Sequence, residues 1–151
     1  MGRIVYHEIR FDIWNYFIET WDVWSLMAPA DRSLRLHSFE ISDNTGNLID
    51  YELQFISAVG SGGTAETEVS GDNGHDGTIQ GSVRTQDTTP GTPAGTIMHW
   101  WYDWSTYYKP WVSYRPPPQM RPVIAPGTGI ALTHHSYDYL GAYGWICWEE
   151  L

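Results

Sequence analysis

The chain has 151 residues, a formal net charge of −10 and one lysine; 17% of its residues are charged and 15% are aromatic. This length fits one domain with a core large enough to fold without disulfides or a metal. The excess of acidic residues excludes nucleic acid as an expected partner, because an acidic surface repels phosphate backbones. The sequence has no run of about 18 apolar residues, so no membrane span is expected.

The first 27 residues are predicted to form an extended N-terminal strand or arm. Ile9, Phe11 and Ile13 alternate with polar residues, which is the pattern of a strand with one covered face. Residues 14–27 are rich in Trp, and their apolar spacing fits either a short helix or a second extended piece; we expect the extended form. Because this aromatic segment precedes the regular series of strands, we expect residues 3–24 to reach a neighbouring subunit or a partner surface.

The remaining residues, 28–151, predict an all-β domain with no long helix. Strands are expected over 33–41, 48–59, 79–85, 97–108, 110–115, 122–125, 129–134 and 144–149. Two Gly-rich loops are expected over 60–78 and 86–96, and Pro126-Gly127 predicts a type II turn. The predicted fold is a single-domain antiparallel β-sandwich, jelly-roll-like, with residues 1–27 as its arm.

Two candidate metal-binding clusters do not fit the ligand patterns of the ions that proteins commonly bind. His134 and His135 are adjacent on a predicted strand, so their rings point to opposite faces and cannot chelate one ion with Asp138. The segment 72–77 resembles a calcium loop, but Gly74 stands where a side-chain ligand is needed. No metal or other cofactor is expected.

Catalytic motifs are also missing from the sequence. It has no Gly-x-Ser-x-Gly elbow and no phosphate-binding loop, and Glu149 and Glu150 alternate in direction along a strand. Cys147 lies among Trp145, Ile146 and Trp148, which predicts a buried, inert thiol. The chain is not expected to be an enzyme.

The stretch His99–Pro118 carries eight Trp or Tyr residues and has two interpretations. Trp100 and Trp101 point to opposite faces of a strand, which favours rings that pack in the core or between subunits. Trp and Tyr also stack on sugar rings, so a row of exposed rings over 100–111 would favour a glycan-binding face instead. The candidate core or interface residues are Trp14, Trp21, Trp24, Trp100, Trp101, Trp104, Tyr108 and Trp111.

Four turn-and-strand motifs resemble a family of small structural proteins of tailed bacteriophages. These are Pro29-Ala30-Asp31-Arg32, Pro116-Pro117-Pro118, Pro126-Gly127-Thr128-Gly129 and the terminal Gly144–Glu150, and the similarity spans the chain except for residues 60–96. The resemblance implies a capsid cement or decoration protein, made in the host cytoplasm and located on the outer capsid surface of the virion. It also implies a homotrimer that binds the major capsid protein.

The leading hypothesis is therefore a virion structural protein that stabilises contacts between major capsid proteins. The alternative is a carbohydrate-binding, lectin-like module of a phage tail or baseplate.

Overall fold

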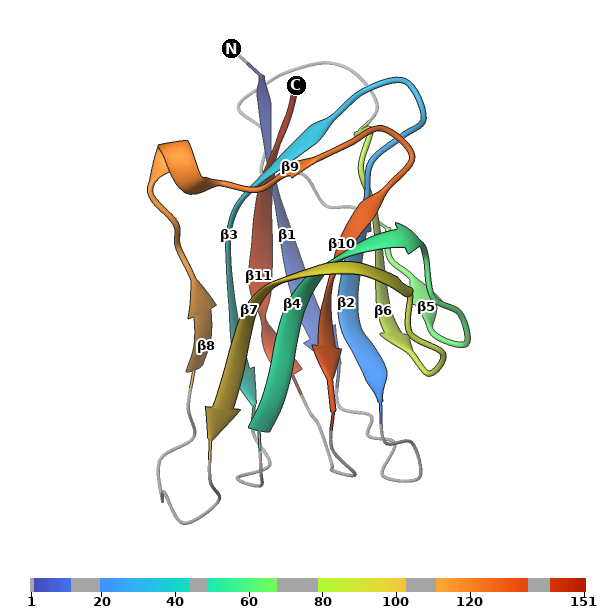
Figure 1. Cartoon of the computed structure of the whole chain (residues 1–151), viewed down its shortest axis with the longest axis vertical. Coiled ribbons are helices and arrows are strands. Elements are labelled where there is room, and N and C mark those ends of the chain that lie inside the picture. The colour runs from blue at the N-terminus through green and yellow to red at the C-terminus, as the bar shows by residue number, and fades with distance from the viewer. Residues whose placement is uncertain (1, 12–19, 44–48, 68–78, 103–110, 136–141) are drawn as a thin grey trace.

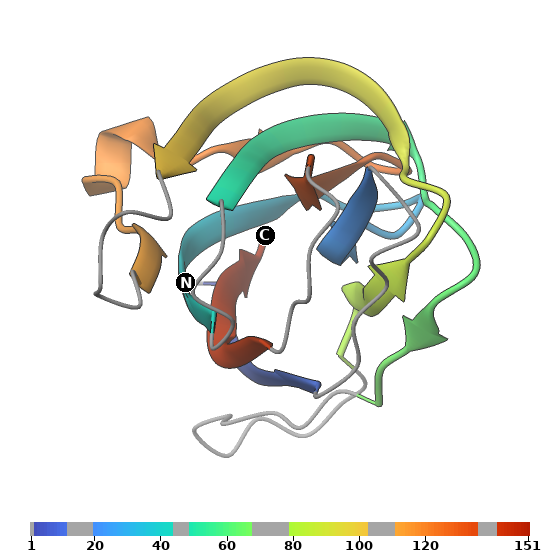
Figure 2. The same cartoon turned by 90° about the horizontal axis from the view of Figure 1, so that it is seen from below.

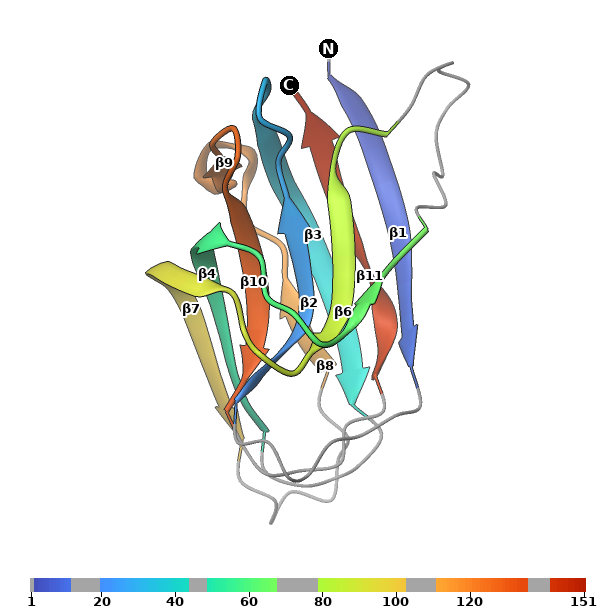
Figure 3. The ribbon, with the colours of Figure 1, turned by 90° about the vertical axis from the view of Figure 1, so that its right-hand side faces the viewer.

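The computed structural model describes residues 2–11, 20–43, 49–67, 79–102, 111–135 and 142–151. Over these residues the chain forms two antiparallel sheets that pack face to face, and the only helix is the single 3-10 turn Pro118–Met120. Figure 3 shows the two layers from the side. The predicted all-β antiparallel sandwich is confirmed.

Each sheet draws its strands from both halves of the chain (Figure 1). Sheet A runs in the order β1 (Arg3–Phe11), β11 (Ala142–Glu150), β3 (Leu34–Asp43), and its last edge is shared by β8 (Trp111–Tyr114) and β9 (Val123–Ile124). Sheet B runs in the order β5 (Thr64–Ala65), β6 (Ser82–Asp87), β2 (Trp21–Met27), β10 (Gly129–His134), β4 (Ile49–Ala58), β7 (Thr92–Tyr102).

The strand pairing follows a simple rule. β1 pairs with β11, β2 with β10, β3 with β8 and β9, and β4 with β7, so the chain forms one long hairpin whose successive pairs alternate between the sheets. β5 and β6 extend sheet B beyond β2. Viewed from below, β4 and β7 curve strongly across one side of the molecule (Figure 2).

Large aromatic residues fill the space between the sheets. Trp24 meets Phe39 edge to face with ring centroids 5.1 Å apart, and Phe39 in turn meets Trp100 at 5.7 Å. Trp21 and Trp148 are also buried, and aliphatic residues of both sheets surround them. Burial of such rings supplies most of the stabilising free energy of a small sandwich.

The N-terminal segment does not project from the domain. Residues Arg3–Phe11 pair along their whole length with Ala142–Glu150, and β2 lies inside sheet B between β6 and β10. Trp21 and Trp24, which we expected in an arm that reaches a neighbour, are fully buried core residues. The physical reason is that an apolar, Trp-rich strand gains more by burial within its own sandwich than by exposure on an arm.

Two further details concern turns and edges. The expected loop over 86–96 is wrong in its second half, because β7 begins at Thr92 and includes Pro93; proline is tolerated there since β7 is an edge strand. The predicted type II turn is confirmed by a φ of +71° at Gly127 and a 3.1 Å hydrogen bond from the Thr128 amide to the Ala125 carbonyl.

Candidate functional site

The outer face of sheet A carries an aromatic surface. In β11 the residues Ala142, Gly144 and Ile146 point to the core, so Tyr143 and Trp145 point outward. Tyr6 of β1 and Trp111 of β8 point outward in the same way. We call Tyr6, Trp111, Tyr143 and Trp145 the aromatic face; Tyr143, Trp111 and Tyr6 are 54%, 52% and 43% exposed.

Neighbouring side chains hold this face in a fixed shape. The rings of Tyr6 and Trp145 stack with centroids 5.3 Å apart, and the guanidinium of Arg115 lies 5.4 Å from the Trp145 ring. Arg115 also forms an ion pair with Glu40. Tyr143 and Trp111 both lie opposite Ser42, whose small side chain leaves the two rings uncovered. A preordered aromatic surface of this kind loses little side-chain entropy when a partner covers it.

The charges around the aromatic face differ from those of the rest of the chain. Among the described residues four cations lie on this side of sheet A, Arg10, Arg35, Arg115 and Arg121, together with the carboxylates Glu8, Glu40 and Glu149. The whole chain has 8 Lys and Arg residues against 18 Asp and Glu residues. Four of the seven cations among the described residues therefore lie on the same side of sheet A as the aromatic face.

Glu149 is the best-anchored carboxylate of this side. It accepts a 3.1 Å hydrogen bond from Arg35 and a 3.4 Å contact from His37. Burial opposes its ionisation, but the His37 hydrogen bond and the Arg35 charge outweigh burial, so the pKa of Glu149 lies below its ordinary value.

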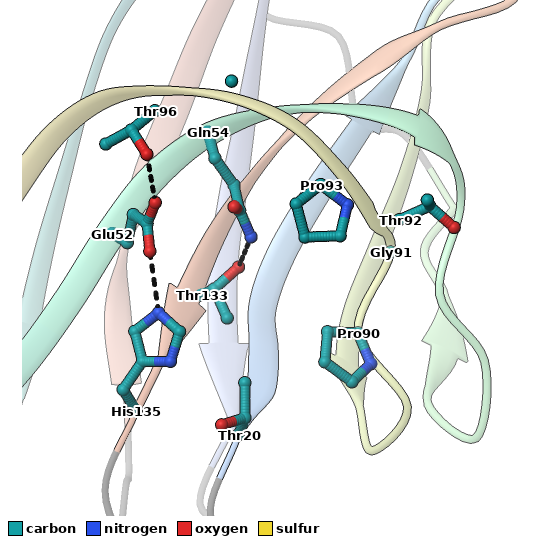
Figure 4. Close-up of a pocket in the computed structure, with 11 residues that line it drawn as sticks. Thr20, Glu52, Gln54, Pro90, Gly91, Thr92, Pro93, Thr96, Thr133 and His135 are labelled. Atoms are coloured by element: carbon teal, nitrogen blue, oxygen red, sulfur yellow. Dashed lines mark hydrogen bonds and ion pairs between the residues drawn. The ribbon is translucent and has the colours of Figure 1, made fainter.

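The outer face of sheet B is polar and hollowed. Core-facing Tyr51 and Leu53 alternate in β4 with Glu52 and Gln54, which point outward. A groove of about 590 Å³ runs over this face, and the segment 90–96 forms its far wall. We call it the polar groove; Figure 4 shows its lining residues.

Hydrogen bonds fix the groove's side chains in two rows. In the first row, the Thr96 hydroxyl and His135 Nε2 both donate to Glu52, the latter over 2.9 Å. In the second row, Gln54 Nε2 donates to Thr133 Oγ1 over 2.8 Å, and the Thr133 hydroxyl donates to Asp22 over 2.7 Å. Figure 4 shows the first row and the Gln54–Thr133 bond side by side.

Asp22 ties the groove's wall to sheet B. Its second carboxylate oxygen accepts a 2.7 Å hydrogen bond from the Gly91 amide, where the chain enters β7. Burial raises the pKa of Asp22, while the bonds from Gly91 and Thr133 act in the opposite direction.

Glu52, in the first row, ionises more readily than Asp22 in the second. Burial opposes ionisation of Glu52, yet the hydrogen bonds from Thr96 and His135 and the nearby imidazoles outweigh it, so the pKa of Glu52 is lowered. The Glu52 carboxylate is therefore negatively charged at neutral pH.

The polar face continues beyond the groove along β4 and β7. Asp50 lies opposite Trp101 and forms an ion pair with His99 when that imidazole is protonated. Trp100 packs toward the core, so Trp101 points outward, and it is 60% exposed. One exposed indole thus stands at the end of a row of polar side chains.

The candidate residues of the aromatic stretch lie in different environments. Trp100 packs against the core, whereas Trp101 and Trp111 are exposed on opposite faces of the sandwich. These three residues form no row of exposed rings. Trp14, Trp104 and Tyr108 lie outside the described residues, as do the segment 72–77 and Asp138.

The predicted orientation of the two histidines is confirmed. His134 is buried against Trp21 and Tyr51, while His135 points into the polar groove. Across the part of the chain that the structure describes, no three His, Cys, Asp or Glu side chains are grouped as a metal site requires. In the same part, no helix has the length and apolarity to cross a bilayer.

Cys147 differs from its prediction. Its side chain points to the outer side of sheet A and is only partly buried, because the strand alternation places Ile146 and Trp148 in the core instead. Burial still raises the pKa of Cys147, so its thiol stays protonated at neutral pH.

Sequence reasoning missed the residues of the polar groove. They come from four separate stretches of the chain, around residues 20, 52–54, 90–96 and 133–135, and only the strand order brings them together. The available signal was local: Glu52 and Gln54 alternate with apolar residues on a predicted strand.

Comparisons of the chain with models of protein families, with curated proteins and with solved structures find no match.

Proposed function

We propose that the chain is a structural protein of a bacteriophage virion, a capsid cement protein whose copies associate through the aromatic face. In this proposal the protein acts by forming interfaces with other proteins and does not catalyse a reaction. The single observation that carries the proposal is the aromatic face itself, where exposed Trp and Tyr rings are held beside Arg115. Trp, Tyr and Arg are the residues that dominate binding energy in protein interfaces.

The winding of the chain supports this choice. In the described residues the first strand pairs with the last and successive pairs alternate between two sheets, a pairing that resembles the winding of a jelly roll. Viral capsid domains and lectins are both built on jelly rolls. This is an analogy of fold, and it favours the two functions that the sequence suggested without choosing between them.

The distribution of charge favours contact between unlike surfaces of two copies. Among the described residues, four of the seven cations lie on the side of sheet A that carries the aromatic face, while most of the described carboxylates lie elsewhere. Face-to-face contact of two copies would bring cations together, whereas contact of this face with another side of a neighbour brings opposite charges together. Heterologous contacts form a closed ring when the rotation between neighbours closes and an open filament when it does not, and the homotrimer that we propose is a closed ring of three.

Mass spectrometry of purified virions of the encoding phage tests the function. A capsid cement protein is expected at hundreds of copies per particle, together with the major capsid protein. A few copies per particle would place the chain in the tail, and its absence from virions would overturn the proposal.

A further inference from the structure

We propose that the polar groove and Trp101 form a binding site for a neutral glycan. This site goes beyond the proposed function, because it lies on the face of the sandwich opposite to the aromatic face. The two proposals therefore involve different residues and fail separately.

The hydrogen-bonding groups of the groove suit hydroxyl groups. The Glu52 carboxylate accepts, His135 keeps Nδ1 for a ligand while Nε2 donates to Glu52, and the exposed imidazole of His99 lies beside the groove. The buried Gln54 and Thr133 are already bonded to each other and to Asp22, so they support the floor of the groove. A sugar hydroxyl also donates and accepts, so closely spaced groups of both kinds match a row of hydroxyls better than they match a ligand of one charge.

The side chains are already held in place before a ligand arrives. Glu52 is fixed by Thr96 and His135, and Gln54 is fixed through Thr133 to the buried carboxylate of Asp22. A site that is ordered in advance loses less entropy on binding, which matters for ligands that contribute few apolar contacts.

The charge of the groove selects against anions. Glu52 keeps its negative charge, and Asp50 lies in the next outward position of β4. These carboxylates repel sialic acids and phosphates. Each of them is paired with an imidazole, His135 or His99, so the site is not a bare acidic cluster that would prefer a cationic peptide.

Trp101 supplies the apolar surface that a sugar ring needs. Its ring is 60% exposed on the same face, one outward position beyond His99. From Trp101 to Thr96 the strand covers roughly 15 Å, at about 3.3 Å per residue. The face is therefore long enough for an oligosaccharide that stacks on Trp101 and reaches into the groove.

The experiment is a titration of the whole protein by calorimetry. The probes are neutral trisaccharides of glucose, of galactose and of N-acetylglucosamine, together with a sialylated trisaccharide and a lysine-rich peptide. At least one neutral trisaccharide is expected to bind, and the sialylated probe is expected to bind more weakly.

Two variants and one matched control locate the site. Trp101→Ala is expected to weaken binding about tenfold or more, since alanine substitution of a stacking ring commonly has such an effect. Glu52→Gln is expected to weaken binding about tenfold, because it removes the groove's charged acceptor and its bond from His135. Trp111→Ala removes a similarly exposed indole from the opposite face and is expected to leave binding unchanged. Circular dichroism and the urea midpoint of each variant establish that it is folded.

Three results would overturn the inference. These are no binding of any neutral trisaccharide at millimolar concentration, stronger binding of the sialylated probe or the peptide, or sugar binding that Trp101→Ala and Glu52→Gln leave intact. Loss of sugar binding in Trp111→Ala would move the site to the aromatic face.

Discussion

The two outer faces of this sandwich each expose one indole of similar accessibility, and the surroundings of the two rings differ. Trp111 lies on the same outer face as Tyr6, Tyr143 and Trp145, with four arginines on that side of sheet A. Trp101 lies at the end of a row of carboxylates that are paired with imidazoles. The first setting suits another protein surface and the second suits a hydroxylated ligand. The identity of a residue says less about its function than the side chains that the fold places around it.

The largest expected effect concerns a Trp that belongs to neither face. Trp24→Ala is expected to lower the free energy of unfolding by about 3–5 kcal/mol, because it leaves a cavity between the sheets beside Phe39. Urea unfolding measures this loss. Trp101→Ala is the control and should change stability by about 0.5 kcal/mol or less. Similar losses in both variants would mean that the exposed and buried rings have been assigned wrongly.

The next effect separates the faces by assembly. Trp145→Ala removes the ring that stacks with Tyr6 and Arg115, and it is expected to weaken subunit association by about 2 kcal/mol, or about thirtyfold. Light scattering after size-exclusion chromatography, over a series of concentrations, measures the association. Trp101→Ala should keep the wild-type mass. If both variants assemble like the wild type, the aromatic face is not the subunit contact.

A smaller effect tests the wall of the polar groove. Asp22→Ala leaves the Gly91 amide and the Thr133 hydroxyl without their acceptor, which is expected to cost about 2 kcal/mol of stability. The same substitution at the exposed Asp31 should cost about 0.5 kcal/mol or less. Chemical denaturation of the two variants gives the comparison. Equal stabilities would show that Asp22 does not hold the wall in place.

The smallest expected effect is a change of stability with pH. His7 is buried between the sheets on β1, and burial lowers its pKa. The unfolded chain therefore binds a proton more readily than the folded chain, so stability is highest above the ordinary His pKa of about 6.5 and falls as the pH drops below it. Glu52 and Glu149, whose pKa values are lowered, lose their contribution only at a more acidic pH.

The urea midpoint at pH 7 and at pH 5 measures the His7 effect. The urea midpoint of the wild type is expected to be lower at pH 5 than at pH 7. The decrease is expected to be smaller in His7→Leu. If the midpoint of His7→Leu decreases as much as that of the wild type, the pH dependence of stability arises from other groups.

Much of the fold could be predicted from local patterns. Alternation over 33–41 predicted β3, a strand was also expected over 129–134 where β10 lies, and Pro126-Gly127 predicted the turn between β9 and β10. Local patterns failed where tertiary context decided the outcome. Residues 92–96 look like a loop because of their Pro and Gly content, yet an edge strand accepts them.

The sites were harder to predict than the strands. Trp21 and Trp24 have the composition of an interface segment, but the position of β2 inside sheet B makes them core residues. The polar groove joins Asp22, Glu52 and His135, which are far apart in the sequence, and no spacing rule connects them. Only strand order and register place such residues on one face.

Hydroxyl-radical footprinting of the associated protein, read by mass spectrometry, tests most directly whether one face is covered while the other stays open. This method reports the solvent access of individual side chains. We predict that Tyr143 and Trp111 are protected relative to a dilute, dissociated sample, whereas Trp101 and His99 react equally in both. Protection of Trp101 together with free reaction of Tyr143 and Trp111 would contradict the account.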